Sequence, residues 1–395
     1  MNYILFDDHS RNDLLPLTYM RPVADIRIGI LTIREKWEKL LNVKTSSLTE
    51  DYLCEKFPTV RGENNILLNG SVCPNTEIID DIKKLKQNQA LVKDDVIIAL
   101  NMKDEDLDDA GEMEIEDIED VLTEADVVKI NHPWDIFRLN GQEIKKDFDL
   151  LTKGRKSLKL SDTNRILGEE NIFIEKGATV EMANLNATTG PIYIGKDALI
   201  MENSTIRGPF AICEGSTVKM GAKIYGPTTL GPFSKLGGEV NNSVIFGYSN
   251  KAHDGFLGNS VIAEWCNIGA DTNNSNLKNS YDNVKLWSYT QETFIDTGLQ
   301  FCGLIMGDHS KTGINTMFNT GTVVGVNCNI FGSGFQRNFI PSFSWGGTKG
   351  FKPYNIKKAV EVAKSVFARR NIEFNDIEKN ILTNVFEITV RNRKS

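Results

Sequence analysis

A period of six residues is the feature of this sequence that most restricts its fold. An aliphatic side chain stands at every sixth position over one continuous stretch, at Ile194, Ile200, Ile206, Ile212, Val218, Ile224, Leu230 and Leu236. A small residue usually stands two positions earlier, as at Ala198 and Ser204. If each hexad forms a short strand and a tight corner, the aliphatic side chains stack on one another from coil to coil. The period therefore predicts a parallel β-helix with a narrow aliphatic interior.

The ladder of aliphatic residues breaks and then returns. It reappears in two later runs, at Phe256, Ile262 and Ile268 and at Met306, Thr312, Phe318, Val324 and Ile330. Residues 271–299 lack the period, so we expect a loop or an irregular coil to leave the helix there. Repeats of this kind resemble those of the hexapeptide acyltransferases. That resemblance implies left-handed coils and assembly as a homotrimer.

The regions on either side of the repeats have other patterns. Before them, strand-like segments alternate with helical patterns, with strands at 3–6, 66–68 and 96–100 and helices at 30–41 and 76–86. After residue 352, apolar residues recur at helical spacing over 355–370 and 374–390. We therefore predict three parts: an α/β domain over 1–150, the β-helix over 151–352 and a helical extension over 353–395.

Composition disfavours several classes of function. The formal net charge is -8, without a basic cluster, so we expect no nucleic-acid partner. No apolar run approaches the roughly 20 residues of a membrane helix, and the N-terminus lacks the basic lead of a signal peptide. We expect a cytoplasmic protein without membrane contact.

The six cysteines are scattered and predict neither a zinc site nor a disulfide framework. The acidic stretch 103–126 is more typical of a solvated face than of a metal site.

Histidine is a candidate for general-base chemistry, because a neutral imidazole can accept a proton near neutral pH. The chain contains four, His9, His132, His253 and His309. His253 lies within the repeat region but outside the aliphatic register, on a face that could meet a substrate. For His309 we expect a surface turn, and for His132 a packing role. His9 is a weaker candidate.

The segment 238–276 resembles the acetyltransferase half of the GlmU-like family, whose members acetylate glucosamine 1-phosphate and then make UDP-N-acetylglucosamine. In that family a run of the form K-A-G-H-x-x-Y-L-G-D precedes N-I-G-A-G-T and an asparagine. The matching runs here are Lys251-Ala252-His253, Phe256-Leu257-Gly258-Asn259, Asn267-Ile268-Gly269-Ala270-Asp271-Thr272 and Asn276. The resemblance implies that His253 is the catalytic base, that Glu239, Asn267 and Asn276 bind substrate, and that acetyl-CoA is the acyl donor.

Two departures from the family pattern concern the sugar phosphate. Phe256 replaces the family tyrosine at a substrate-binding position and lacks its hydroxyl. The basic residues of the family that precede the histidine fall on Gly237 and Asn241. Another cation would have to supply that charge, and the candidates are Lys251, Lys235 and Lys278.

The N-terminal region is similar to the sugar nucleotidyltransferase half of the same family. Residues 11–22 resemble its G-T-R-x-x-P-L-T-x-x-x-P-K-P motif, and Asn69-Gly70-Ser71 resembles an N-G-D motif whose aspartate holds magnesium. The resemblance implies Arg11, Arg21 and Asn69 as nucleotide or phosphate contacts, with Mg²⁺ as a cofactor only if this domain is active. Equally, the arginines could form structural ion pairs in a degenerate domain, because Asp7-Asp8-His9-Ser10 replaces the phosphate-binding glycines. This compact variant resembles a group of bacterial GlmU-like proteins named sugar nucleotidyltransferases.

The expected function is therefore acetyl transfer from acetyl-CoA to an amino sugar, as a sugar phosphate or nucleotide sugar, in nucleotide-sugar synthesis. One alternative is a sugar-1-phosphate nucleotidyltransferase that uses UTP or dTTP. Another is a non-catalytic trimeric scaffold or sensor, since hexad coils also serve as rigid spacers.

Overall fold

A computed structural model of the protein describes residues 2–106 and 118–393. Much of the acidic stretch, 107–117, lies outside the described residues. The chain divides into two compact units. The first comprises Met1–Leu14, Met20–Ile26 and Leu31–Asn131, and the second comprises Leu15–Tyr19, Arg27–Ile30 and His132–Ser395.

The first unit is built around a six-stranded mixed sheet, which confirms the α/β prediction for this part of the chain. Its strand order is β2 (Ser46–Leu48), β1 (Asn2–Phe6), β3 (Asn64–Asn69), β6 (Val96–Lys103), β5 (Gln89–Lys93) and β7 (Glu119–Leu122). A two-stranded ladder joins β4 (Val72–Cys73) to β8 (Val128–Lys129). The helices are α1 (Ser10–Asp13), α2 (Ile33–Leu41) and α3 (Thr76–Ile82).

Local sequence signals explain where helix α2 begins and how it packs in this unit. It begins at a capping box in which the Thr32 hydroxyl accepts from the Glu35 amide at 3.1 Å, and the Glu35 carboxylate accepts from the Thr32 amide at 2.7 Å. Its buried face carries Trp37, whose indole N–H donates to the Val72 carbonyl at 3.0 Å. The helix is thereby fixed to β4.

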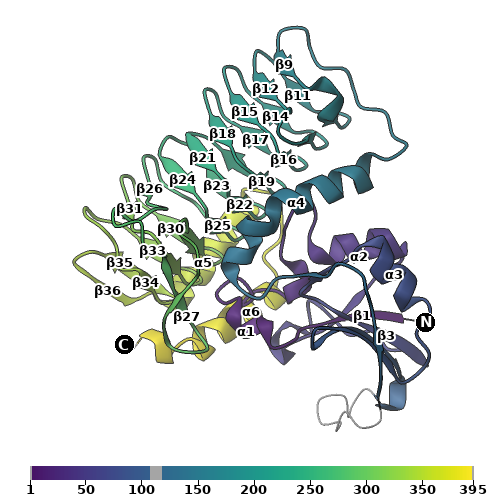
Figure 1. The fold of residues 1–395 in the computed structure, drawn as a ribbon. Coiled ribbons are helices and arrows are strands. Elements are labelled where there is room, and N and C mark those ends of the chain that lie inside the picture. Colours follow the sequence, from purple (N-terminus) through teal and green to yellow (C-terminus); the bar gives the residue numbers. More distant parts are fainter. Residues whose placement is uncertain (1, 107–117, 394–395) are drawn as a thin grey trace. The chain divides into compact units, whose positions relative to one another are not determined.

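The second unit is a parallel β-helix with three faces, as the six-residue period predicts (Figure 1). The first face contains β10 (Ile172–Ile174), β13 (Ile192–Ile194), β16 (Phe210–Ile212), β19 (Thr228–Leu230), β22 (Val244–Ile245), β25 (Val261–Ile262), β29 (Leu304–Met306), β32 (Thr322–Val324) and β34 (Phe339–Ile340). The second face contains β11 (Thr179–Val180), β14 (Leu199–Ile200), β17 (Thr217–Val218), β20 (Lys235–Leu236) and β23 (Asn250–Lys251).

Isolated bridges from Asn250 to Asn267 and from Asn267 to Lys311 continue the second face beyond β23. They lead to β30 (Lys311–Thr312), β33 (Asn329–Ile330), β35 (Ser344–Gly347) and β36 (Gly350–Pro353). The third face contains β9 (Arg165–Leu167), β12 (Asn184–Asn186), β15 (Thr205–Arg207), β18 (Lys223–Tyr225), β21 (Glu239–Asn241) and β24 (Phe256–Gly258). A short ladder of β26 (Asn273–Asn274) with β31 (Met317–Phe318) lies farther along the chain.

The predicted aliphatic ladder forms the interior of the coils. Ile206 pairs with Ile224, and Ile224 with Val240, so these side chains stack from coil to coil. The prediction for Phe256 is wrong, because Leu257 occupies the interior position above Val240 and Phe256 stands outside it. The cause is a shortened hexad: the interior residues Leu257 and Ile262 are five positions apart instead of six, so counting back six from Ile262 reaches Phe256.

The non-periodic stretch leaves the β-helix as predicted. Within 271–299 the chain forms an antiparallel hairpin of β27 (Lys285–Ser288) and β28 (Thr293–Asp296). The coils resume at β29, where Ile305 pairs with Val261 and Met306 with Ile262. The hairpin is therefore an insertion between adjacent coils.

Helix α4 (Pro133–Thr152) belongs to the second unit, so the boundary between the units falls at 131–132 rather than at the predicted 150. Asn140 explains the difference. Its side-chain oxygen accepts from the Gly29 amide at 2.8 Å and from the Thr229 hydroxyl at 3.1 Å, while its amide group donates to the Pro227 carbonyl at 3.2 Å. These bonds tie α4 to the coils.

The chain closes with two helices, α5 (Ile356–Ala368) and α6 (Asp376–Ile388), at the two places predicted to be helical. Each begins after an asparagine whose side chain caps the first turn, Asn355 in α5 and Asn375 in α6. Both helices belong to the second unit. Among the described residues, no helix combines the length and the hydropathy that crossing a membrane requires.

Candidate functional site

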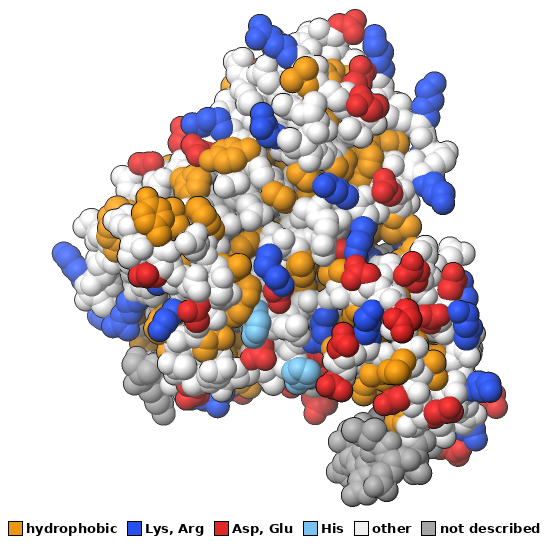
Figure 2. Space-filling view, viewed as in Figure 1, with side chains coloured by type: hydrophobic (Ala, Val, Ile, Leu, Met, Phe, Trp, Pro, Cys, Tyr) orange, Lys and Arg blue, Asp and Glu red, His pale blue; other side chains and the backbone are white. Residues whose placement is uncertain are grey.

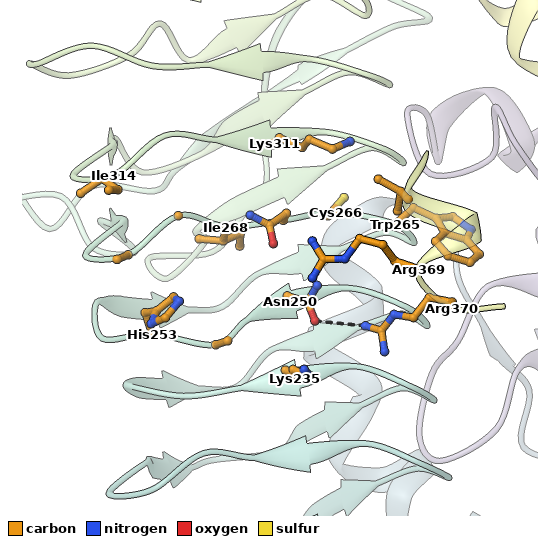
Figure 3. A pocket seen from close by; sticks show the side chains of 15 residues that line it. Lys235, Asn250, His253, Trp265, Cys266, Ile268, Lys311, Ile314, Arg369 and Arg370 are labelled. Carbon is orange, nitrogen blue, oxygen red and sulfur yellow. Dashed lines mark hydrogen bonds between the residues drawn. The ribbon is translucent and has the colours of Figure 1, made fainter. Parts of the chain in front are cut away.

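A pocket of about 630 Å³ opens where the second face of the β-helix meets the end of helix α5. Its floor carries one outward-facing residue from each of four successive coils, because Lys235 pairs with Asn250, Asn250 with Asn267, and Asn267 with Lys311. Figure 3 shows His253 at one end of this floor and Arg369 and Arg370 at the other. The volume is typical of a small-molecule site.

Positive charge is concentrated in this pocket. Four of the described residues that line it carry positive charge: Lys235, Lys311, Arg369 and Arg370. None of the described lining residues carries a carboxylate. By contrast, acidic and basic side chains are interspersed on the face shown in Figure 2. The pocket is therefore a local anion site on a chain of net charge -8.

Burial lowers the pKa of two of these cations. It lowers the pKa of Lys311, whose ammonium donates to the His309 carbonyl at 2.8 Å. Burial, followed by repulsion from Arg369, lowers the pKa of Arg370, whose guanidinium donates to the Asn250 side-chain oxygen at 3.3 Å (Figure 3). Both charged forms would be favoured by an anion, which supplies the opposite charge that the lining residues lack.

An aromatic stack holds the arginine end of the pocket in place. Trp265 lies at a corner of the coil, where its backbone is in the left-handed conformation with φ 62°. Its ring stacks against the ring of Phe367 of α5 at a centroid distance of 3.9 Å. Tyr248, at the equivalent corner one coil earlier, stacks on the other side of Trp265 at 4.3 Å. Arg369 and Arg370 follow Phe367 by two and three residues, so this contact positions both.

His253 lies at the corner that follows β23, and its side chain is exposed at the pocket. Asn267, also exposed, lies on the adjacent coil and lines the same pocket. The structure thus brings together the predicted base and one predicted substrate-binding asparagine. An imidazole beside an amide donor and a cationic cavity can remove a proton from a bound anionic substrate and stabilise a polarised carbonyl.

Three other predicted substrate residues lie outside this pocket. Glu239 and Phe256 pair with each other on the third face. The Glu239 carboxylate accepts from the Tyr225 hydroxyl at 2.6 Å. The Asn276 side chain donates to the Asn259 side-chain oxygen at 2.8 Å. These residues form a second group on another face of the same coils.

Lys251 is not placed to contact a substrate, contrary to the sequence prediction. Its side chain occupies the interior position of its coil, next to Leu236, and is 2% exposed.

The expectation for His309 is also wrong. This residue is 2% exposed, because its ring lies beside Trp265 and Phe367 at centroid distances of 6.3 and 6.1 Å. His132 stacks on Trp134 at 4.2 Å, and His9 is exposed.

In the first unit, the predicted phosphate contacts are engaged by the protein itself. Arg11 is 5% exposed and donates to the Asp7 carboxylate at 2.7 Å and to the Tyr52 hydroxyl at 3.2 Å. Arg21 is also 5% exposed. The Asn69 side chain, 2% exposed, donates to the Asp8 carboxylate at 3.1 Å. The alternative of structural interactions in a degenerate domain accounts for these contacts.

The contacts of Asp7 and Asp8 also decide whether these carboxylates are available to bind Mg²⁺. The Asp8 carboxylate lies 3.1 Å from the Lys129 ammonium, and the Asp7 carboxylate accepts from Arg11 and from the Val23 amide at 2.8 Å. Across the described residues, no group of three or more His, Cys, Asp or Glu side chains is arranged to hold a metal ion. The residues present in this region therefore do not fit the Mg²⁺ site of a nucleotidyltransferase.

Sequence reasoning missed three of the four cations that line the pocket: Lys311, Arg369 and Arg370. The Arg369-Arg370 pair stands at the end of the predicted helix 355–370, which was a signal for an anion contact near a helix terminus. Its position next to His253 could not be read from the sequence, because more than a hundred residues separate the two in the chain.

Comparison with known proteins agrees with both halves of the sequence analysis. Residues 3–156 match a family model described as sugar nucleotidyl transferase. Over 227 residues the chain is 29% identical to the bifunctional protein GlmU of Methanocaldococcus jannaschii, covering 56% of this chain and 50% of that protein. Over 313 residues it is 27% identical to the bifunctional sugar-1-phosphate nucleotidylyltransferase/acetyltransferase of Sulfurisphaera tokodaii, covering 77% and 69%.

Among solved structures, the polySia specific acetyltransferase NeuO aligns with 53% of this chain at 15% identity and a TM-score of 0.28. The chain spans about half the length of several curated relatives it matches. It has the organisation of proteins that join a sugar-nucleotidyltransferase-like region to a hexad-repeat β-helix. Within that class the chain is similar to GlmU proteins over about half of its length, the similarity that its motifs indicate.

Proposed function

We propose that the protein transfers an acetyl group from acetyl-CoA to the amino group of a sugar phosphate or nucleotide sugar, in nucleotide-sugar synthesis. The observation that carries this proposal is the pocket itself, which unites His253, Asn267 and four cations where the second face of the coils meets the end of α5. Both proposed substrates bear phosphate, and lysine and arginine side chains are suited to bind it.

In the proposed reaction, the His253 imidazole removes a proton from the acceptor amine as the amine nitrogen attacks the thioester carbonyl. A tetrahedral intermediate forms, with negative charge on the former carbonyl oxygen. The Asn267 amide donates a hydrogen bond to that oxygen. The carbon–sulfur bond then breaks, and the imidazolium returns the proton to the leaving thiolate. The products are an N-acetylated sugar and free CoA.

A homotrimer would complete this site. Glu239 and Phe256 lie on the third face and Asn276 is bonded to Asn259 at the end of it, whereas the pocket with His253 opens on the second. In a threefold arrangement, the third face of one subunit can face the second face of the next. The acceptor sugar would then lie between subunits, with the acetyl donor along the cationic pocket.

The cationic end of the pocket gives a first prediction. Replacing Arg369 and Arg370 together by glutamine should raise KM for acetyl-CoA about tenfold or more, because each charged hydrogen bond to phosphate contributes roughly 1.5–3 kcal/mol. The kcat should change little, since phosphate binding is equal in the ground and transition states. Steady-state release of thiol from acetyl-CoA measures both constants.

A matched control lies in the same helix. Lys357 and Lys358 are exposed in the first turn of α5 and do not line the pocket, so their double glutamine variant should keep the wild-type KM. An equal KM in the two double variants would refute the assignment of the pocket to the donor. If CoA also fails to raise the melting temperature of the wild-type protein, the scaffold alternative holds instead.

A second candidate function is nucleotidyl transfer in the first unit, favoured by the match of residues 3–156 to the sugar nucleotidyl transferase model. The buried, engaged side chains of Arg11, Arg21 and Asn69 count against it. Pyrophosphate release from UTP or dTTP with a sugar 1-phosphate and Mg²⁺ tests this candidate separately from thiol release.

A further inference from the structure

Lys251 is a charged residue in the aliphatic interior of the β-helix. On the coil before it, the equivalent position holds Leu236, which is fully buried, and on the coil after it Ile268, 3% exposed. An aliphatic residue at this position would continue the stack. Burying an ammonium among such side chains costs free energy unless hydrogen bonds and opposite charges compensate. Packing therefore does not explain why a lysine stands at this position.

The ammonium of Lys251 has a specific partner. It donates a hydrogen bond to the backbone carbonyl of His253, two residues farther along the chain. Two carboxylates supply favourable charge, Asp254 at the same corner and Asp271 at the corresponding corner of the next coil. Burial nevertheless dominates and lowers the pKa of Lys251 to about 8. The lysine thus remains inside the coil and reaches only as far as the corner that carries His253.

The corner itself is tightly built. Gly255 has φ 115°, and a Cβ there would lie 2.2 Å from the Thr272 carbonyl oxygen of the next coil. The exposed His253 ring has no hydrogen-bond partner within the described part of the chain. A catalytic imidazole is usually oriented by a group bound to its second nitrogen. Here its direction depends on the main chain to which the ring is attached.

We propose that Lys251 is the positioning residue for His253, holding the backbone of the His253 corner so that the imidazole points into the pocket. This inference rests on the proposed acetyl transfer. It assigns Lys251 a role inside the coil in place of substrate contact. The role accounts for a buried charge where the neighbouring coils have leucine and isoleucine.

The test replaces Lys251 by methionine, which keeps an unbranched side chain and removes the donor. We expect kcat for thiol release to fall about tenfold to a hundredfold, because small misplacements of a catalytic group have effects of this size. KM for acetyl-CoA should stay within about twofold, since the pocket cations are untouched. The melting temperature should be unchanged or higher, because a buried charge is removed.

Leu236→Met is the matched control, one coil away at the same interior position, and should keep the wild-type kcat. Hydrogen exchange of the 253–255 amides gives a readout independent of turnover and should become faster in Lys251→Met only. Unchanged kcat, or a fall in kcat with an equal loss in Leu236→Met, would overturn the proposal. If wild-type protein releases no thiol, the acetyl-transfer proposal fails, while slow wild-type and fast variant exchange would still show that Lys251 holds the corner.

Discussion

His253→Ala is expected to lower kcat for acetyl transfer by about 10²- to 10⁴-fold, the usual contribution of a positioned general base. The reason is that the acceptor amine must lose its proton during attack on the thioester, and His253 is the titratable base at that end of the pocket. KM for acetyl-CoA should remain close to the wild-type value, because the four cations that we assign to phosphate remain. The measurement is steady-state thiol release with glucosamine 1-phosphate as acceptor.

His9 provides the control for this experiment. It is also an exposed histidine but belongs to the first unit, so His9→Ala should retain wild-type acetyl transfer. His253→Gln tests the chemistry further, since it keeps a polar side chain but cannot act as a base, and should be as inactive as the alanine variant. Full activity of both His253 variants would show that another group takes the proton.

Ile224→Ala should lower the free energy of unfolding by about 2–5 kcal/mol, the range for truncating a buried isoleucine. Ile224 is 1% exposed and stacks between Ile206 and Val240 on adjacent coils. Its removal leaves a cavity that the narrow interior cannot close, because the main chain of the neighbouring coils is fixed by its ladder of hydrogen bonds. Denaturant unfolding followed by circular dichroism measures the loss.

The neighbouring residue supplies the comparison. Lys223 precedes Ile224 on β18, points outward and forms an exposed ion pair with Glu239 at 3.6 Å. Lys223→Ala should change the free energy of unfolding by less than about 1 kcal/mol. Ile224→Val should lie between the two variants. Equal losses at positions 223 and 224 would show that stacking in the interior does not dominate the stability of the coils.

Much of the fold could be predicted because its local rule is repeated. Each hexad contributes one interior residue, so the sequence from Ile194 to Leu236 specifies both the strands and the side of each strand that is buried. The rule failed where hexads are shortened: Val240 follows Leu236 by four positions, and Ile262 follows Leu257 by five, which puts Leu257 rather than Phe256 in the interior. Residues missing from the corners leave no compositional signal, so only the pairing of the coils could show where they are missing.

The site was less predictable than the fold for a physical reason. His253 and Asn267 lie on adjacent coils, close enough in sequence for a motif to record them together. Arg369 and Arg370 reach the pocket because Phe367 stacks on Trp265, a contact between distant segments that leaves no period or spacing in the sequence. The predictions for Lys251 and His309 were wrong because a charge suggested exposure for the first and a turn suggested it for the second, whereas both side chains are buried by their positions in the coils.

The central claim is that chemistry takes place in the pocket of the β-helix and that the chemistry is acyl transfer. The most direct test incubates wild-type protein with acetyl-CoA, glucosamine 1-phosphate, UTP and Mg²⁺, and measures thiol and pyrophosphate in the same reaction. Our account predicts thiol release that requires the amino sugar and is lost in His253→Ala. Pyrophosphate release without any release of thiol would contradict it.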